Sequence, residues 1–191
     1  MSEINENSLE GRNKFLEYIK KYKKYIISIL ILLLVTIISA IITNNLSVKK
    51  NEDISKLFNK ANILIKQEKK KEALKIYEEI VLKKNKFYSP ISLNAIIENN
   101  LIPEKSIDEM FDELIKIRGL AKEEKNLIRL KKGIYLSGQN NENELLNSLS
   151  PLINENSIWK ILAAKTLRDF YLIRGEKNKS LQYDKILEKS E

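Results

Sequence analysis

The chain contains neither cysteine nor histidine, and it has only five glycines and three prolines in 191 residues. The absence of cysteine and histidine excludes a thiol nucleophile, an imidazole base, a disulfide framework and the usual zinc sites. Gly133 and Gly138 have the spacing of a phosphate loop, but Gln139 and Asn140 follow where Lys and Ser or Thr would stand. We therefore expect no enzyme, no cofactor, and no catalytic or metal-binding residue.

Charge is abundant but mixed in sign. The chain has 34 Lys and Arg against 26 Asp and Glu, a formal net charge of +8. A nucleic-acid reader would be expected to gather its basic residues on one stripe or in a known module, and the sequence shows neither. We expect no nucleic-acid partner and no small-molecule substrate.

One long apolar run interrupts this charged sequence. Residues 25–43, YIISILILLLVTIISAIIT, contain no charged side chain, and about twenty helical residues at 1.5 Å each cross the hydrocarbon core of a bilayer. A cleavable export signal has a shorter apolar run close to the start and a small-residue cleavage site. This run begins after 24 residues, so it is predicted to be a retained transmembrane helix.

Basic residues flank this helix unequally. Residues 10–24 contain six Lys or Arg, whereas residues 44–58 contain three. Because positive charge is retained on the cytoplasmic side, residues 1–24 are predicted to be a cytoplasmic basic tail. Residues 44–51 then form a linker, and residues 52–191 form a domain across the membrane.

The rest of the chain predicts helices only. No segment alternates apolar and polar residues between turn signals, so no strand is expected. All three prolines, Pro90, Pro103 and Pro151, are interpreted as residues at helix starts, where a missing N–H costs least. The predicted helices cover residues 52–67, 70–84, 89–100, 103–117, 120–136, 142–154, 157–173 and 176–189. The fold class is all-α, with paired helices joined by short turns.

A repeat of 34 residues, the period of the tetratricopeptide helix pair, aligns packing positions. Ala61, Leu64, Ala73 and Tyr77 fit the pattern in the first unit. Stepping forward by 34 residues pairs Leu57 with Ile91, Ala61 with Ala95, Ala73 with Ile107, Tyr77 with Phe111, and Ile80 with Leu114. The second unit is weaker, with Glu98 where Leu64 stood. Later units are assigned Gly133, Leu136, Leu145 and Leu149, at a spacing of 38, and then Tyr171, Gly175, Ser180 and Leu187. An ordinary helical bundle is the alternative.

The last two predicted helices carry the clearest apolar stripe. It comprises Trp159, Leu162, Ala163, Thr166, Leu167, Phe170 and Tyr171, which fall at helical spacing. We interpret Trp159 as a core residue rather than an exposed partner anchor. Gly175 is predicted to end the helix in a left-handed cap.

The sequence SIWKILAAK (157–165), followed by LIRGEKNKSL (172–181), resembles the ancillary subunit of the bacterial SecYEG translocon. The resemblance implies a single-pass inner-membrane protein with a tetratricopeptide-like periplasmic domain over residues 52–191. It also implies association with the translocon and with a membrane-anchored periplasmic chaperone. The alternative is a membrane-anchored helical scaffold or ligand sensor for envelope assembly, unrelated to the translocon. The partner-binding residues remain unknown from the sequence.

The charge asymmetry leads to a topology test. A C-terminal alkaline phosphatase fusion should be active, because the enzyme folds only outside the cytoplasm, and the mature protein should keep its N-terminus. A full-length but inactive fusion would reverse the orientation, and a mature protein starting near residue 40 would make the run a signal.

Overall fold

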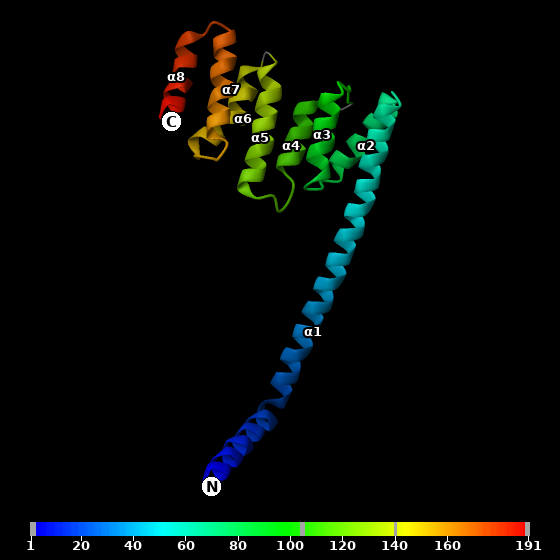
Figure 1. Cartoon of the computed structure of the whole chain (residues 1–191), viewed down its shortest axis with the longest axis vertical. Helices are drawn as coiled ribbons and strands as arrows, with labels where there is room; N and C mark the ends of the chain where they lie inside the picture. Colours follow the sequence, from blue (N-terminus) through cyan, green and yellow to red (C-terminus); the bar gives the residue numbers. More distant parts are fainter. Residues whose placement is uncertain (1–2, 104–105, 140, 190–191) are drawn as a thin grey trace. The chain divides into compact units, whose positions relative to one another are not determined.

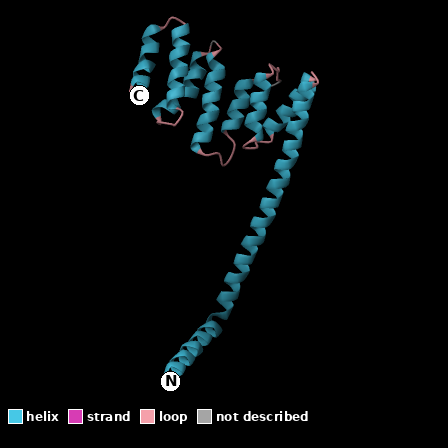
Figure 2. Cartoon of the chain, viewed as in Figure 1, coloured by secondary structure: helices cyan, strands magenta, loops and turns pink. Residues whose placement is uncertain are grey.

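The computed structural model describes residues 3–103, 106–139 and 141–189, and these ranges contain eight α-helices and no strand (Figures 1 and 2). The all-α prediction is confirmed. Glu104, Lys105, Asn140 and the last two residues of the predicted 52–191 domain lie outside the described part. The helices are α1 (Glu3–Lys66), α2 (Lys70–Leu82), α3 (Tyr88–Glu98), α4 (Ile107–Ile115), α5 (Lys122–Ser137), α6 (Glu142–Asn154), α7 (Lys160–Ile173) and α8 (Lys177–Glu188). The chain divides into two compact units, residues 1–52 and 53–191.

The first unit lies within α1 and contains the apolar run. Among the described residues, the segment Lys21–Ser39 is long and apolar enough to cross a membrane, and none of it is buried in the protein. Tyr22 and Tyr25 lie at its start, with ring centroids 6.5 Å apart, and the Nζ atom of Lys21 lies 5.6 Å from the centre of the Tyr22 ring. Such amphipathic aromatic and basic groups suit the boundary between headgroups and hydrocarbon.

In the second unit the helices run alternately up and down, so that their loops gather at two edges (Figure 1). The most extensive packing joins α2 to α3, α5 to α6 and α7 to α8. Loops 83–87, 116–121 and 155–159 lie at one edge (Figure 1). We call it the entry edge because Phe58, near the start of the unit, contacts Tyr88 beside loop 83–87. Residues 67–69, 99–103, 138–139 and 174–176 lie at the opposite edge.

Several helices end in a residue with a positive φ, which lets the following N–H groups reach back to the last carbonyls. Gly175 has φ 76°, its N–H donates to the Leu172 carbonyl at 3.1 Å, and the Glu176 N–H donates to the Tyr171 carbonyl at 2.9 Å. The predicted left-handed cap at Gly175 is thus confirmed. The same conformation is adopted by Glu68, Lys84, Asn100 and Asn156.

The prolines correct the predicted helix starts. Pro90 lies in the first turn of α3, as expected. Pro103 precedes α4 without starting it, because the Ser106 Oγ accepts the Glu109 N–H at 3.1 Å and caps the helix there. Pro151 does not start a helix; it lies inside α6. The backbone hydrogen bond lost there is offset by the full burial of neighbouring Leu149 and Leu152.

Two hydrophobic cores share α5. The buried residues of the first core fall between Ala61 and Ile117, with Ile128 added from α5. Those of the second core fall between Leu130 and Tyr171. Tyr135 packs against both cores. The packing positions of the first and third predicted repeat units are buried, whereas Glu98 of the second is exposed. The helix pairs fit the repeat and the ordinary bundle alike, so the tetratricopeptide-like repeat stays a prediction.

Gly133 sets the distance between α5 and α6. A Cβ atom placed on Gly133 would lie 2.3 Å from the Cδ2 atom of Leu149, whose side chain is fully buried. Any larger residue at position 133 must displace that leucine within a close-packed core.

We therefore expect Gly133→Ala to destabilise the protein. Overpacking costs about 1–3 kcal/mol, more than the roughly 1 kcal/mol by which alanine favours a helix interior over glycine. Thermal unfolding of the full-length protein in mild detergent, followed by circular dichroism, measures the change.

Gly138→Ala is the matched control, because the nearest atom to its added Cβ is a backbone oxygen at 3.6 Å and its φ is −80°. It should leave the unfolding temperature unchanged or raise it slightly, because alanine restricts the unfolded chain more than glycine does. Equal effects at positions 133 and 138 would contradict the close α5–α6 contact.

Candidate functional site

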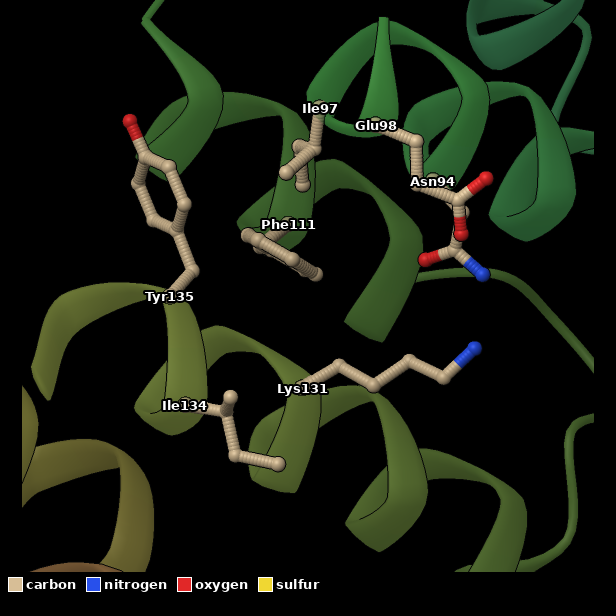
Figure 3. Close-up of a pocket in the computed structure, with 7 residues that line it drawn as sticks. All are labelled: Asn94, Ile97, Glu98, Phe111, Lys131, Ile134 and Tyr135. Atoms are coloured by element: carbon tan, nitrogen blue, oxygen red, sulfur yellow. The ribbon is translucent and has the colours of Figure 1, made fainter. Parts of the chain in front are cut away.

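A pocket of about 330 Å³ opens where α3, α4 and α5 meet (Figure 3). It lies wholly within the second unit. Its lining residues are Asn94, Ile97 and Glu98 from α3, Phe111 from α4, and Lys131, Ile134 and Tyr135 from α5. The pocket thus draws on three helices that are consecutive in the chain.

The apolar part of the lining is an extension of the first core. Phe111 is only 2% exposed, and its ring centroid lies 6.1 Å from that of Tyr135. Ile134, in contrast, is 53% exposed. A partner side chain entering here would cover Ile134 and contact a rigid aromatic floor that is already packed.

Polar groups occupy one side of the same pocket. Figure 3 shows the side chains of Asn94, Glu98 and Lys131 at one side, while Ile97, Phe111, Ile134 and Tyr135 form the rest of the lining. One carboxylate, one ammonium group and one amide give both hydrogen-bond donors and acceptors. A mostly apolar concave site with a few polar groups is typical of a binding site.

The buried Lys132, next to Lys131 in sequence, holds the helices around this pocket. It is 5% exposed, and its Nζ donates to Asp112 Oδ1 at 2.8 Å. Glu144 Oε2 lies 3.8 Å away and Asp108 Oδ1 4.0 Å away, which is too long for a hydrogen bond. These carboxylates come from α4 and α6, so the lysine joins three helices.

Trp159 is half-buried against the second core and hydrogen-bonded rather than free to anchor a partner. Its indole N–H donates to the Glu123 carbonyl at 3.1 Å. Ser157 donates to a carboxylate oxygen of Glu123, and Asn126 Nδ2 donates to Ser157 Oγ at 3.2 Å. The interpretation of Trp159 as a structural residue agrees with these contacts, which fasten the start of α7 to α5.

A second polar network joins α6, α7 and α8. Tyr171 OH and Lys179 Nζ both donate to Glu142 Oε1 at 2.8 Å. The hydrogen bond from Lys179, together with the one from Tyr171, lowers the pKa of the Glu142 carboxyl. Burial, and then the bond to Glu142, raises the pKa of Tyr171. The Tyr183 ring stacks on Tyr171 with centroids 5.9 Å apart. This network is structural, because each group has its partner within the fold.

The polar side chains of the pocket could position a bound group. Within the described residues, no group of three or more acidic side chains is placed to hold a metal ion. Lys131, Glu98 and Asn94 can orient a bound group by charge and hydrogen bonding.

No partner-binding residue was predicted from the sequence, and none of the pocket residues was expected to form a site. A signal was present in Gly133-Ile134-Tyr135, three consecutive nonpolar residues of one helix. Successive helical residues point about 100° apart, so these three cannot all face one core. Of the three, Ile134 is the one that is exposed, at 53%.

The role of Lys132 can be tested against its neighbour. Lys132→Ala should destabilise the protein by about 1.5–3 kcal/mol, the usual worth of hydrogen bonds to charged groups. Lys131→Ala should change stability by less than about 0.5 kcal/mol, because Lys131 is partly exposed at the pocket rim. Chemical denaturation of the full-length protein measures both, and a larger loss at position 131 would refute the assignment.

Compared with known proteins, the chain matches no family model, no curated protein sequence and no solved structure.

Proposed function

We propose that this protein is a membrane-anchored protein-interaction scaffold. The apolar segment of the first unit holds it at a membrane, and the helical second unit binds another protein through the α3–α4–α5 pocket. The observation that carries the proposal is the exposed Ile134 over a packed aromatic floor, bordered by Lys131 and Glu98.

The apolar lining and charged rim of the pocket suit a protein partner. An amphipathic helix or an extended segment inserts apolar side chains between helices and uses charged groups for register. An anchor of the size of leucine or phenylalanine fits a space of about 330 Å³. Charged groups of both signs at the rim can pair with either sign on the partner.

We further propose that the partner belongs to the Sec translocon or is a membrane-anchored periplasmic chaperone. The support is the resemblance of residues 157–165 and 172–181 to the ancillary translocon subunit. The same resemblance implies a bacterial inner membrane, a cytoplasmic N-terminus and a periplasmic second unit. In this account the protein is not an enzyme.

A ligand sensor is the second candidate, because a pocket of about 330 Å³ falls at the lower end of the range for small-molecule sites. A sensor would bind a small apolar molecule in the same place. The two candidates differ in whether a protein or a small molecule covers the exposed side chain of Ile134.

The scaffold predicts binding that needs both units. Tethering strengthens a weak contact by about 10²–10⁴ without adding a contact. Full-length protein purified in mild detergent should therefore retain translocon or chaperone subunits, and Ile134→Arg should lose most of them, because a charge replaces the apolar contact. Affinity purification with quantitative mass spectrometry measures this.

Ile173→Arg is the matched control, since Ile173 is 87% exposed at the end of α7, outside the pocket lining. It should retain the partners. Replacing residues 25–43 by an unrelated spanning helix separates position in the membrane from direct contact by that helix. Partners unchanged by Ile134→Arg would refute the pocket, and envelope-assembly factors without translocon subunits would favour the rival scaffold.

A further inference from the structure

The loop between α2 and α3 displays an aromatic side chain in a fixed position. Phe87 is 64% exposed. The Asn85 Oδ1 atom accepts the N–H groups of Phe87 at 3.0 Å and Tyr88 at 2.8 Å, and Ser89 Oγ accepts the Asn85 N–H at 2.8 Å. These hydrogen bonds fix the backbone on both sides of the exposed ring.

A row of aromatic rings connects Phe87 to the core. Its ring meets Tyr88 edge-on with centroids 5.0 Å apart, Tyr88 lies 5.9 Å from Phe58, and Phe58 lies 5.9 Å from the buried Tyr77. The positions between Phe87 and the core are therefore already occupied by other rings. Phe87 stays at the surface, with exposed Leu82 preceding the same loop.

Basic residues surround this ring. The Lys86 Nζ atom donates to the Gly119 carbonyl, which ties loop 83–87 to loop 116–121. The two loops carry five basic residues and no acidic one. The five are Lys83, Lys84, Lys86, Lys116 and Arg118. We call these five residues, with Leu82 and Phe87, the basic patch.

Two glutamates from the adjoining helices compensate only part of this charge. Lys83 pairs with Glu79 at 3.0 Å, while Lys84 and Lys116 pair with Glu113 at 2.8 and 3.3 Å. Five positive charges against two negative ones leave the basic patch with +3. It therefore attracts a polyanion despite its ion pairs.

The opposite edge of the second unit has no comparable charge. By sequence, residues 99–103 and 137–141 carry none, and residues 67–69 and 174–176 carry one charge of each sign. Ile102 is exposed there, at 88%, and residues 99–103 around it carry no charge. The combination of an exposed ring and net positive charge thus distinguishes the entry edge.

We infer that the basic patch binds anionic lipid headgroups, with Phe87 entering the membrane interface. Lysines and arginines attract acidic headgroups, and an aromatic ring beside them gains by leaving water. By sequence, the second unit begins at Asp53, ten residues after Thr43 of the predicted span. This inference rests on the membrane anchor of the proposed function, because that anchor keeps lipid close and lets a weak contact form.

The full-length protein allows a clean test, because it has no native cysteine. Leu82→Cys, labelled with an environment-sensitive fluorophore, reports on the basic patch without removing Phe87. Ile102→Cys reports on the opposite edge. Each labelled protein is reconstituted in phosphatidylcholine vesicles with or without phosphatidylglycerol, together with lipids that carry a quencher at the headgroup.

The expected result is quenching at position 82 only with phosphatidylglycerol, lost at high salt, and absent at position 102. The double variant Lys83→Glu with Arg118→Glu, and separately Phe87→Ser, should lose the quenching. Lys70→Glu with Lys177→Glu, exposed lysines near the opposite edge, should keep it. Salt dependence is expected because screening weakens attraction between exposed charges.

Equal quenching at both positions overturns the inference, as does quenching at position 82 that does not depend on phosphatidylglycerol or on the basic patch. Full retention in the bilayer without quenching at position 82 also overturns it and leaves the anchor intact. Release of the protein by alkaline extraction refutes the anchor instead. Displacement of the label from lipid by an acidic protein or RNA at physiological salt would assign the patch to that partner.

Discussion

The second unit depends on one helix that must pack on both sides. Ile128 and Leu130 are both buried, only two residues apart in α5, yet they belong to different cores. A helix in this position has little room to move, and Gly133 brings it against Leu149 with no space for a methyl group. The buried Lys132 then fixes α5 to carboxylates of α4 and α6.

The pocket is a consequence of this constraint. While α5 is held by α4, α6 and α7, its outer side faces α3 across the pocket, with Phe111 of α4 as the floor. Rigid walls favour binding. A site that is already ordered loses less conformational freedom when a partner binds than a flexible loop would. In the proposed scaffold, such a pocket would hold a partner weakly, and the apolar segment of α1 would supply proximity.

The sequence predicted the fold well because its signals were local. Helix spans follow apolar periodicity and turn residues, and Ser106 delays the start of α4. The predicted helix start at residue 52 was wrong, because α1 runs from Glu3 to Lys66 and includes the predicted linker 44–51. The pocket depends on how α3 and α5 are spaced by α4, a tertiary property that no short pattern records. Lys132 shows the same limit: it follows another lysine and looks like part of a solvated face, but the α4 and α6 carboxylates let it be buried. The exposure of Phe87 could not be predicted from the sequence either. It depends on a row of aromatic rings from three helices that occupies the space between Phe87 and the core.

We propose that a membrane protein partner binds at the α3–α4–α5 pocket. The most direct measurement places a photo-crosslinking amino acid at position 134 of the full-length protein in living cells and identifies what it captures. The account predicts a crosslink to a translocon subunit or a membrane-anchored chaperone, absent when the same group stands at position 173. No protein crosslink at position 134, with the protein itself readily detected, or the same products from both positions, would contradict it.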